Sequence, residues 1–271
     1  MRQMRLIDSI EDQNIIDLPK EASYRERLSA LLSGDLDFHE QDSSYASHTI
    51  HPFPAKFPPQ MPRTFIDSLT AQGDLVLDPM MGSGTTILEA FLSGRQAIGF
   101  DIDPLAVLVS KVKTQPLDTG KAIQAGNHVL YQAKQTIARH GQELQESLKI
   151  ERDKSTQRFL NYWFDLGTQI ELLALIREIK KLPDNDVKNF LRLVFSGTII
   201  TKRGGVSLAL DLAHTRPHRA KVVLNQAGEV ILEQDLSSVS RKRAKILTKT
   251  LKSPIEEFRK RLLAVSKQLP N

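Results

Sequence analysis

The sequence contains no cysteine and no long apolar run. The missing thiols exclude disulfide bonds and thiolate metal sites, although they say little about compartment. Residues 1–8 are charged within a few positions, and no apolar stretch approaches the length that spans a bilayer. We therefore expect a soluble, cytoplasmic protein with no metal site and no membrane partner.

The glycine turn over Gly82–Thr86 lacks the residues that two common nucleotide sites require. A dinucleotide fingerprint would need a third glycine at Ile87, and a P-loop would need a lysine within the turn. A pyrophosphate is therefore not the natural ligand. A glycine turn in an unrelated α/β domain is the alternative interpretation of this motif.

Around this turn the sequence predicts half of a βαβ unit. Leu75–Asp78 and Ala97–Phe100 are expected as parallel strands. The helix between them covers Ile87–Ser93 and ends at Gly94. Asp101 follows the second strand, 19 residues after the first glycine, where nucleotide-binding crossovers place an acid on a ribose. Unpaired backbone N–H groups at the start of the helix can bind a carboxylate. Acidic side chains at the ends of both strands can bind an amine and ribose hydroxyls. S-adenosylmethionine (SAM) carries all of these groups.

Two motifs resemble those of DNA methyltransferases that modify exocyclic amino groups. Asp78-Pro-Met-Met-Gly-Ser-Gly-Thr-Thr86 resembles their cofactor motif. His51-Pro-Phe-Pro-Ala-Lys-Phe-Pro58 resembles the segment that they place against the methionine end of the cofactor, and a rigid proline-rich connector is the alternative. The motifs stand 20 residues apart, in the family's order. The resemblance implies SAM as the cofactor, contacted by Pro54, Ala55, Lys56, Phe57, Asp78, Pro79, Met80, Gly82, Ser83, Gly84, Thr85, Thr86, Asp101 and Ile102.

The same resemblance implies an α/β fold: a partial Rossmann-like class I methyltransferase domain with a helical insert and a small β-hairpin. Apolar residues at helical spacing predict helices over Lys121–Leu148 and Gln169–Leu182, and alternating residues predict a hairpin around Asn225–Gly228. The aromatic cluster Asn161–Phe164 belongs either to the core or to a base-stacking surface. Four regions are expected: an N-terminal extension (1–45), a SAM-binding βαβ half (46–115), a helical insert (116–200), and basic loops, hairpin and C-terminal helix (201–271).

The positive charge is concentrated toward the C-terminal end of the sequence. Residues 1–190 contain 21 Lys and Arg against 26 Asp and Glu, whereas residues 191–271 contain 16 against 6. Such a surplus favours a nucleic-acid partner, here double-stranded DNA, and a merely solvated basic surface is the alternative. Two donor-rich loops supply the expected phosphate contacts, which are Lys202, Arg203, Arg216 and Arg219.

The sequence also lacks the loop that would hold and activate the amine that accepts the methyl group. Members of the family hold the flipped base with a short Asp/Asn/Ser-Pro-Pro-aromatic loop, which accepts both amino hydrogens. The nearest string here, Phe57-Pro-Pro-Gln60, offers neither the acceptor nor the stacking face. Two parallel strands also cannot form an independently stable sheet. We therefore name no catalytic residue, and we expect either a second polypeptide that supplies the loop or a truncated protein.

The resulting hypothesis is the SAM-binding part of a site-specific DNA methyltransferase of a restriction-modification system. It would transfer a methyl group to N4 of cytosine or N6 of adenine. The alternatives are an RNA methyltransferase of the same fold and an inactive SAM- or DNA-binding remnant.

Overall fold

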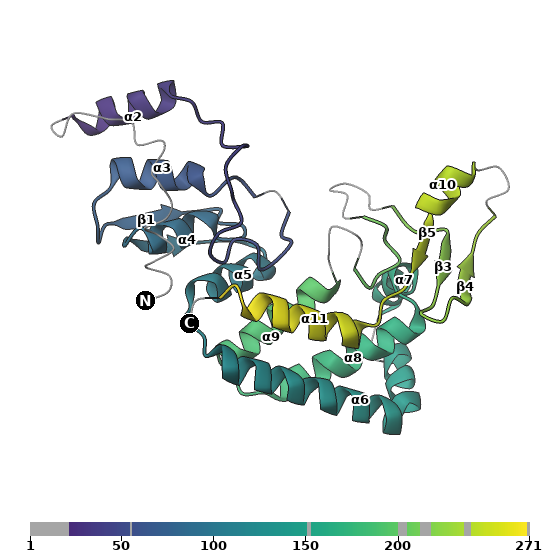
Figure 1. Ribbon diagram of the computed structural model, residues 1–271. Coiled ribbons are helices and arrows are strands. Elements are labelled where there is room, and N and C mark those ends of the chain that lie inside the picture. The colour runs from purple at the N-terminus through teal and green to yellow at the C-terminus, as the bar shows by residue number, and fades with distance from the viewer. Residues whose placement is uncertain are drawn as a thin grey trace. The chain divides into compact units, whose positions relative to one another are not determined.

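The computed structural model describes residues 22–54, 56–150, 153–199, 205–211, 218–235 and 240–269. The chain divides into two compact units (Figure 1). The first consists of Met1–Leu117 with Gln268–Asn271, and the second of Asp118–Lys267. None of the helices in the described part of the chain is long and apolar enough to cross a membrane.

Two parallel strands form the sheet of the first unit. Strand β1 (Leu75–Asp78) pairs in register with β2 (Gln96–Gly99). Helix α4 (Thr85–Leu92) connects them, since parallel neighbours require a crossover. Gly94 follows this helix with a φ of 72°, a left-handed conformation that turns the chain back toward β2. The predicted strand–helix–strand order is therefore confirmed.

Three further helices complete the described part of the first unit. They are α2 (Tyr24–Ser33), α3 (Gln60–Leu69) and α5 (Pro104–Thr114). Helix α3 packs against α2 and α4, and α5 packs against α4. A capping box between Ser23 and Glu26 begins α2, and the side chain of Asp103 caps α5. The core between these helices contains the buried side chains of Leu31, Ile66, Leu88, Ala106 and Val109.

One face of the two-stranded sheet carries exposed apolar side chains. Leu77 of β1 is 61% exposed, Ile98 of β2 is 44% exposed, and Phe100 just beyond β2 is 60% exposed. Successive side chains of a strand point to opposite faces. Helix α4 packs on both strands, and its Ile87 lies where a Cβ at Gly99 would stand. Within the described part of the chain, the face opposite α4 is therefore open to solvent.

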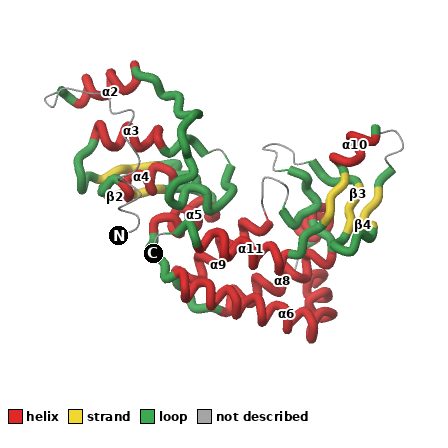
Figure 2. The backbone as a smooth tube through the Cα atoms, in the orientation of Figure 1, coloured by secondary structure: helices red, strands yellow, loops and turns green. Residues whose placement is uncertain are grey.

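Helices dominate the second unit, as the red segments of Figure 2 show. Helix α6 (Thr119–Ile150) packs against α8 (Leu166–Lys181), α9 (Asp186–Ile199) and α11 (Pro254–Ser266). Gly126 allows the close approach of α6 to α11, because a Cβ there would collide with the side chain of Leu262. The chain kinks inside α6 at His140, whose backbone is not helical.

Three elements of the second unit were not predicted. Strands β3 (Val222–Leu224) and β4 (Val230–Glu233) form the expected hairpin, but β5 (Thr248–Thr250) adds to β3 in parallel and gives the order β4-β3-β5. The sequence of β5, Thr-Lys-Thr, contains no apolar residue and therefore shows no alternation. Helix α10 (Arg241–Ile246) and helix α7 (Lys154–Trp163) were also missed. The apolar side chains of α7 stand only within Phe159–Trp163, and part of this run was interpreted as an aromatic cluster.

Candidate functional site

The carboxyl ends of β1 and β2 bring two aspartates to the glycine turn. Asp78 accepts the backbone N–H of Met80 at 3.1 Å. Asp101 accepts the N–H of Gly82 through Oδ2 and the N–H of Asp103 through Oδ1, both at 2.8 Å. Asp101 therefore ties the glycine turn to the end of β2. Each carboxylate oxygen still has a second lone pair that can accept a hydroxyl.

The glycine turn depends on two glycines in left-handed conformations. Gly82 has a φ of 51° and Gly84 a φ of 74°, which side-chain-bearing residues rarely adopt. A Cβ at Gly84 would in addition collide with Ser110 of α5. Gly84 is the N-cap of α4 and provides no side-chain cap. Among the described residues, no acceptor is found for the N–H groups of Ser83 and Thr85, so the turn presents donors.

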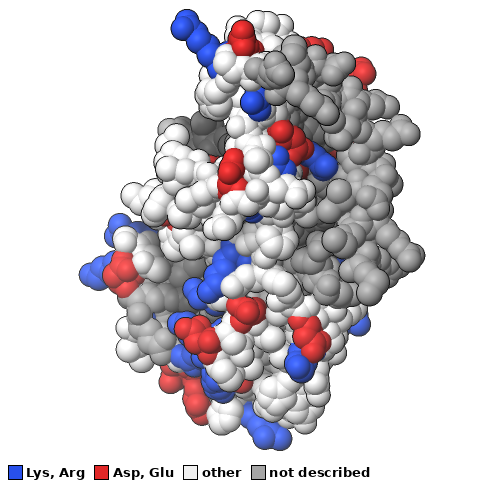
Figure 3. All heavy atoms as spheres, turned by 90° about the vertical axis from the view of Figure 1, so that its left-hand side faces the viewer, with Lys and Arg blue, Asp and Glu red and all other residues white. Residues whose placement is uncertain are grey.

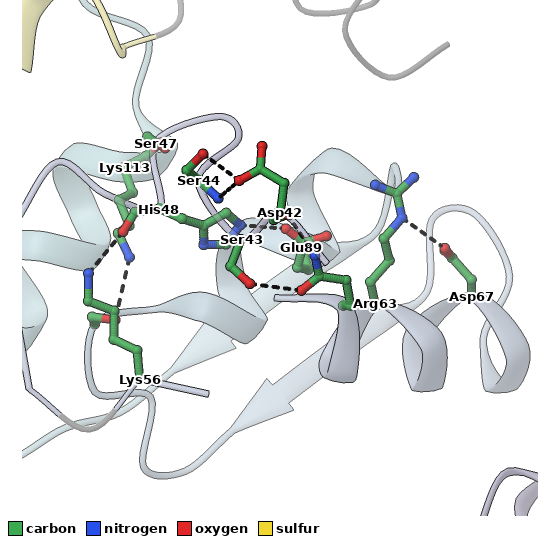
Figure 4. Close-up of polar contacts among 12 residues, drawn as sticks. Asp42, Ser43, Ser44, Ser47, His48, Lys56, Arg63, Asp67, Glu89 and Lys113 are labelled. Carbon is green, nitrogen blue, oxygen red and sulfur yellow. Dashed lines mark hydrogen bonds and ion pairs between the residues drawn. The ribbon is translucent and has the colours of Figure 1, made fainter. Parts of the chain in front are cut away.

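A buried histidine–glutamate pair attaches the proline-rich segment, residues 47–58, to helix α4 (Figure 4). His48 Nε2 lies 2.6 Å from Glu89 Oε1, and the two side chains are 4% and 0% exposed. Burial lowers the pKa of His48, so the imidazole is neutral at pH 7 and its Nε2–H donates to the carboxylate. The ring of Tyr45 packs edge-on against His48, and burial raises the pKa of its phenol.

Two further contacts hold the same segment. Ser47 Oγ donates to the backbone carbonyl of Lys113 at 3.0 Å, across 66 residues of sequence. Lys56 Nζ donates to the carbonyls of His48 at 3.0 Å and His51 at 2.7 Å. The ammonium of Lys56, which the resemblance places near the methionine end of SAM, thus holds the backbone of its own segment.

Lys113 lies fully buried behind the glycine turn. Its Nζ donates to Ser83 Oγ at 3.4 Å. Burial, assisted by repulsion from Lys56, lowers the pKa of Lys113 to about 7. Sequence reasoning missed His48, Glu89 and Lys113. A signal was present for the last two, because Glu89 interrupts an apolar helix and Lys113 continues the buried spacing of Ala106 and Val109.

The predicted cofactor residues differ in exposure. Exposed are Pro54, Phe57, Pro79, Met80 and Ile102; partly buried are Lys56, Asp78, Gly82, Thr86 and Asp101; buried are Ser83, Gly84 and Thr85. Ala55 lies outside the described residues. The structure brings the glycine turn and Asp101 into direct contact, and it joins the proline-rich segment to α4 through the His48–Glu89 pair.

In the second unit, Arg219 lies on an aromatic side chain. Its guanidinium stands 4.6 Å from the ring centroid of Tyr162, and its Nε donates to the Tyr162 carbonyl at 2.8 Å. Tyr162 is half exposed, whereas Phe164 belongs to a buried cluster and the partly buried Trp163 packs against it, so the core interpretation holds for these two aromatics. Arg219 also lines a cavity of about 530 Å³. Three further predicted nucleic-acid contacts lie outside the described residues: Lys202, Arg203 and Arg216.

Charges are mixed on the face of the molecule that Figure 3 shows. Lys and Arg side chains lie there among Asp and Glu side chains, without a patch of one sign among the residues described. The described residues also contain no group of three or more His, Asp or Glu that could hold a metal ion.

Comparison with known proteins identifies related sequences. Residues 23–112 match the model of the N6/N4 family described as DNA methylase. The Type II methyltransferase M.MvaI of Kocuria varians is 30% identical over 197 residues, which are 70% of this chain and 40% of that protein. The Type II methyltransferase M.MjaII of Methanocaldococcus jannaschii is 32% identical over 164 residues, 59% of this chain and 30% of that protein.

The Type II methyltransferase M.BglI of Bacillus subtilis is 45% identical over 56 residues, 21% of this chain and 16% of that protein. The chain thus spans less than half the length of the relatives that it matches. No solved structure matches it.

Proposed function

We propose, from the premise that residues 23–112 belong to the N6/N4 family of DNA methylases, that this chain is the SAM-binding part of a DNA amino-methyltransferase. The bound cofactor would supply an electrophilic methyl group on its sulfonium. The acceptor would be N4 of cytosine or N6 of adenine in double-stranded DNA, within a restriction-modification system.

The contact between Asp101 and the glycine turn is the observation that carries this proposal. A carboxylate at the end of β2 holds the Gly82 amide at 2.8 Å, next to a turn that offers unused N–H donors. Acceptors for ribose hydroxyls and donors for a carboxylate therefore lie side by side, as the two ends of SAM require. We assign the ribose to Asp101 and the methionine end to the turn and to the segment around Lys56 and Phe57.

The proposed architecture is a partial Rossmann-like class I domain. Residues 46–115 would bind SAM, 116–200 would form the helical insert, and 201–271 would face DNA, with 1–45 as an extension. Support comes from the parallel pairing of β1 and β2 around α4 and from the helical second unit. Arg219 would contact a phosphate through the guanidinium nitrogens that do not bind Tyr162.

The amine-activating loop would come from outside these 271 residues. The sequence contains no Asp/Asn/Ser-Pro-Pro-aromatic string, and no residue described here is assigned to polarise the acceptor amine. We propose that a second polypeptide or further sequence supplies this loop, and that the residues described here bind and orient the donor.

Calorimetry of SAM binding to the purified chain tests the cofactor assignment. We expect Asp101→Ala to weaken binding roughly 10- to 100-fold, because hydrogen bonds to a charged group contribute about 1.5–3 kcal/mol. Asp101→Asn keeps an acceptor for the Gly82 N–H and should lose less SAM affinity than Asp101→Ala. Glu146→Ala removes an exposed acid of α6 and serves as the control. Unchanged affinity in Asp101→Ala would remove the assignment.

A further inference from the structure

Lys113 is a fully buried amine, charged below its pKa of about 7, and it has no ion-pair partner among the described residues. Glu89 attracts it from α4 and Lys56 repels it from the proline-rich segment, while neutral His48 lies in the same cluster (Figure 4). Desolvating a charge is costly unless hydrogen bonds or opposite charge offset it. A structural position at this depth on α5 would be filled at lower cost by an apolar residue such as Val109, one turn earlier.

The one side-chain hydrogen bond of Lys113 in the described chain leads to the glycine turn. Its Nζ donates to Ser83 Oγ at 3.4 Å, and Ser83 is 4% exposed. In its charged form Lys113 has donors only, so below pH 7 the Ser83 oxygen must accept. The hydroxyl proton of Ser83 is then free to be donated elsewhere, and the described residues offer it no acceptor.

The surroundings of Ser83 add donors of the same kind. Gly82 and Gly84 on either side hold the turn open in left-handed conformations. The N–H groups at the start of α4 find no acceptor in the described chain, and the helix dipole adds positive potential there. The turn is therefore an arrangement of donors with a buried positive charge behind it.

We propose that Lys113 is a positioning residue that, through Ser83, makes the glycine turn selective for the carboxylate of SAM. This inference rests on the proposed function. Lys113 does not touch the cofactor; it fixes the direction of the Ser83 hydroxyl and places positive charge behind it. The ligand group that the turn takes is thus an anion rather than the amine of the methionine end.

Paired ligands separate this role from a structural one. Binding of SAM and of decarboxylated SAM, which lacks only the carboxylate, is measured by calorimetry on the full chain at pH 6, where Lys113 is charged. We expect wild type to prefer SAM about tenfold or more. Lys113→Met, which removes the amine and keeps most of the side-chain length, should weaken the binding of SAM about tenfold and leave the binding of decarboxylated SAM unchanged. Lys111→Met is the matched control, because Lys111 is exposed on the same helix, and it should alter neither affinity.

Each outcome decides the proposal. Equal weakening of both ligands in Lys113→Met, or no weakening of either, would overturn it. Ser83→Ala removes only the hydroxyl and should lose the same preference for SAM. This second variant keeps the test valid even if Lys113→Met fails to fold. Retention of the preference in Ser83→Ala would also overturn the proposal. A wild-type chain that binds neither ligand would instead defeat the proposed function on which the inference depends.

Discussion

The two units of this chain use their buried residues differently. In the first unit, a polar cluster of His48, Glu89, Ser83 and Lys113 is buried at the glycine turn. In the second unit, side chains such as Phe190, Leu193 and Phe258 fill the spaces between helices, and their burial is complete. The first unit also leaves apolar side chains of its sheet exposed, as Leu77 shows.

This difference separates what stabilises the chain from what prepares a site. Apolar burial is non-directional and holds helices together over a wide range of side chains. A buried polar network is directional, and it fixes particular atoms at the cost of desolvation. We therefore expect stability to depend mostly on the second unit, and ligand recognition to depend on the polar cluster of the first.

The largest expected effect is a loss of core packing in the second unit. Phe258→Ala removes a fully buried ring of α11 and should lower the free energy of unfolding by about 3–5 kcal/mol. SAM affinity of the folded protein should not change. Urea unfolding measures the loss, and Phe159→Ala on α7 is the control, since that ring is 59% exposed. Similar losses in both variants would contradict the role assigned to this core.

A smaller loss is expected in the polar cluster of the first unit. Glu89→Ala leaves the buried Nε2–H of His48 without an acceptor and should lower the free energy of unfolding by about 1–3 kcal/mol. Glu89→Gln keeps an acceptor oxygen and should lower the free energy of unfolding by less. Urea unfolding compares the two. Equal losses would mean that the negative charge, rather than the hydrogen bond, is what the cluster requires.

The pH dependence of stability should carry a contribution from Lys113. Its pKa is about 7 in the folded chain, against an ordinary value of 10.5, so between pH 7 and about 9 the unfolded state binds more protons. The free energy of unfolding should therefore rise with pH, by up to about 1.4 kcal/mol per pH unit from this group. Lys249, whose pKa burial lowers to about 8, adds to the same slope. Lys113→Met should reduce the slope in this range, and an unaltered slope would refute the assignment.

The smallest effect concerns the surface of the second unit. Arg219→Gln should weaken DNA binding only a few-fold and reduce the magnitude of the salt slope by about 1, as expected for one phosphate contact. Binding to duplex DNA at several salt concentrations measures this slope. Arg139→Gln, an exposed change on α6, is the control. A slope equal to that of wild type would show that Arg219 does not bind phosphate.

Helical and strand periods predicted much of the secondary structure, because they are encoded locally. Helices α6 and α8 begin and end within a few residues of their predicted bounds. Helix α7 and strand β5 escaped prediction for physical reasons. The first has its apolar side chains only within Phe159–Trp163, too short a run to show a repeated helical period, and the second, Thr-Lys-Thr in sequence, gains its place only by pairing with β3.

The sequence by itself determined the strand–turn–helix arrangement and the aspartates at the strand ends. Glycines that must take a positive φ and a fixed spacing between two strands are local constraints, and they can be recognised without knowing what packs nearby. The tertiary structure alone decided which side chains meet behind the turn. His48 and Glu89 are 41 residues apart, Ser83 and Lys113 are 30 apart, and no periodicity encodes such partners. Those pairs exist because packing brings α4, α5 and the proline-rich segment together and removes water from the polar groups between them.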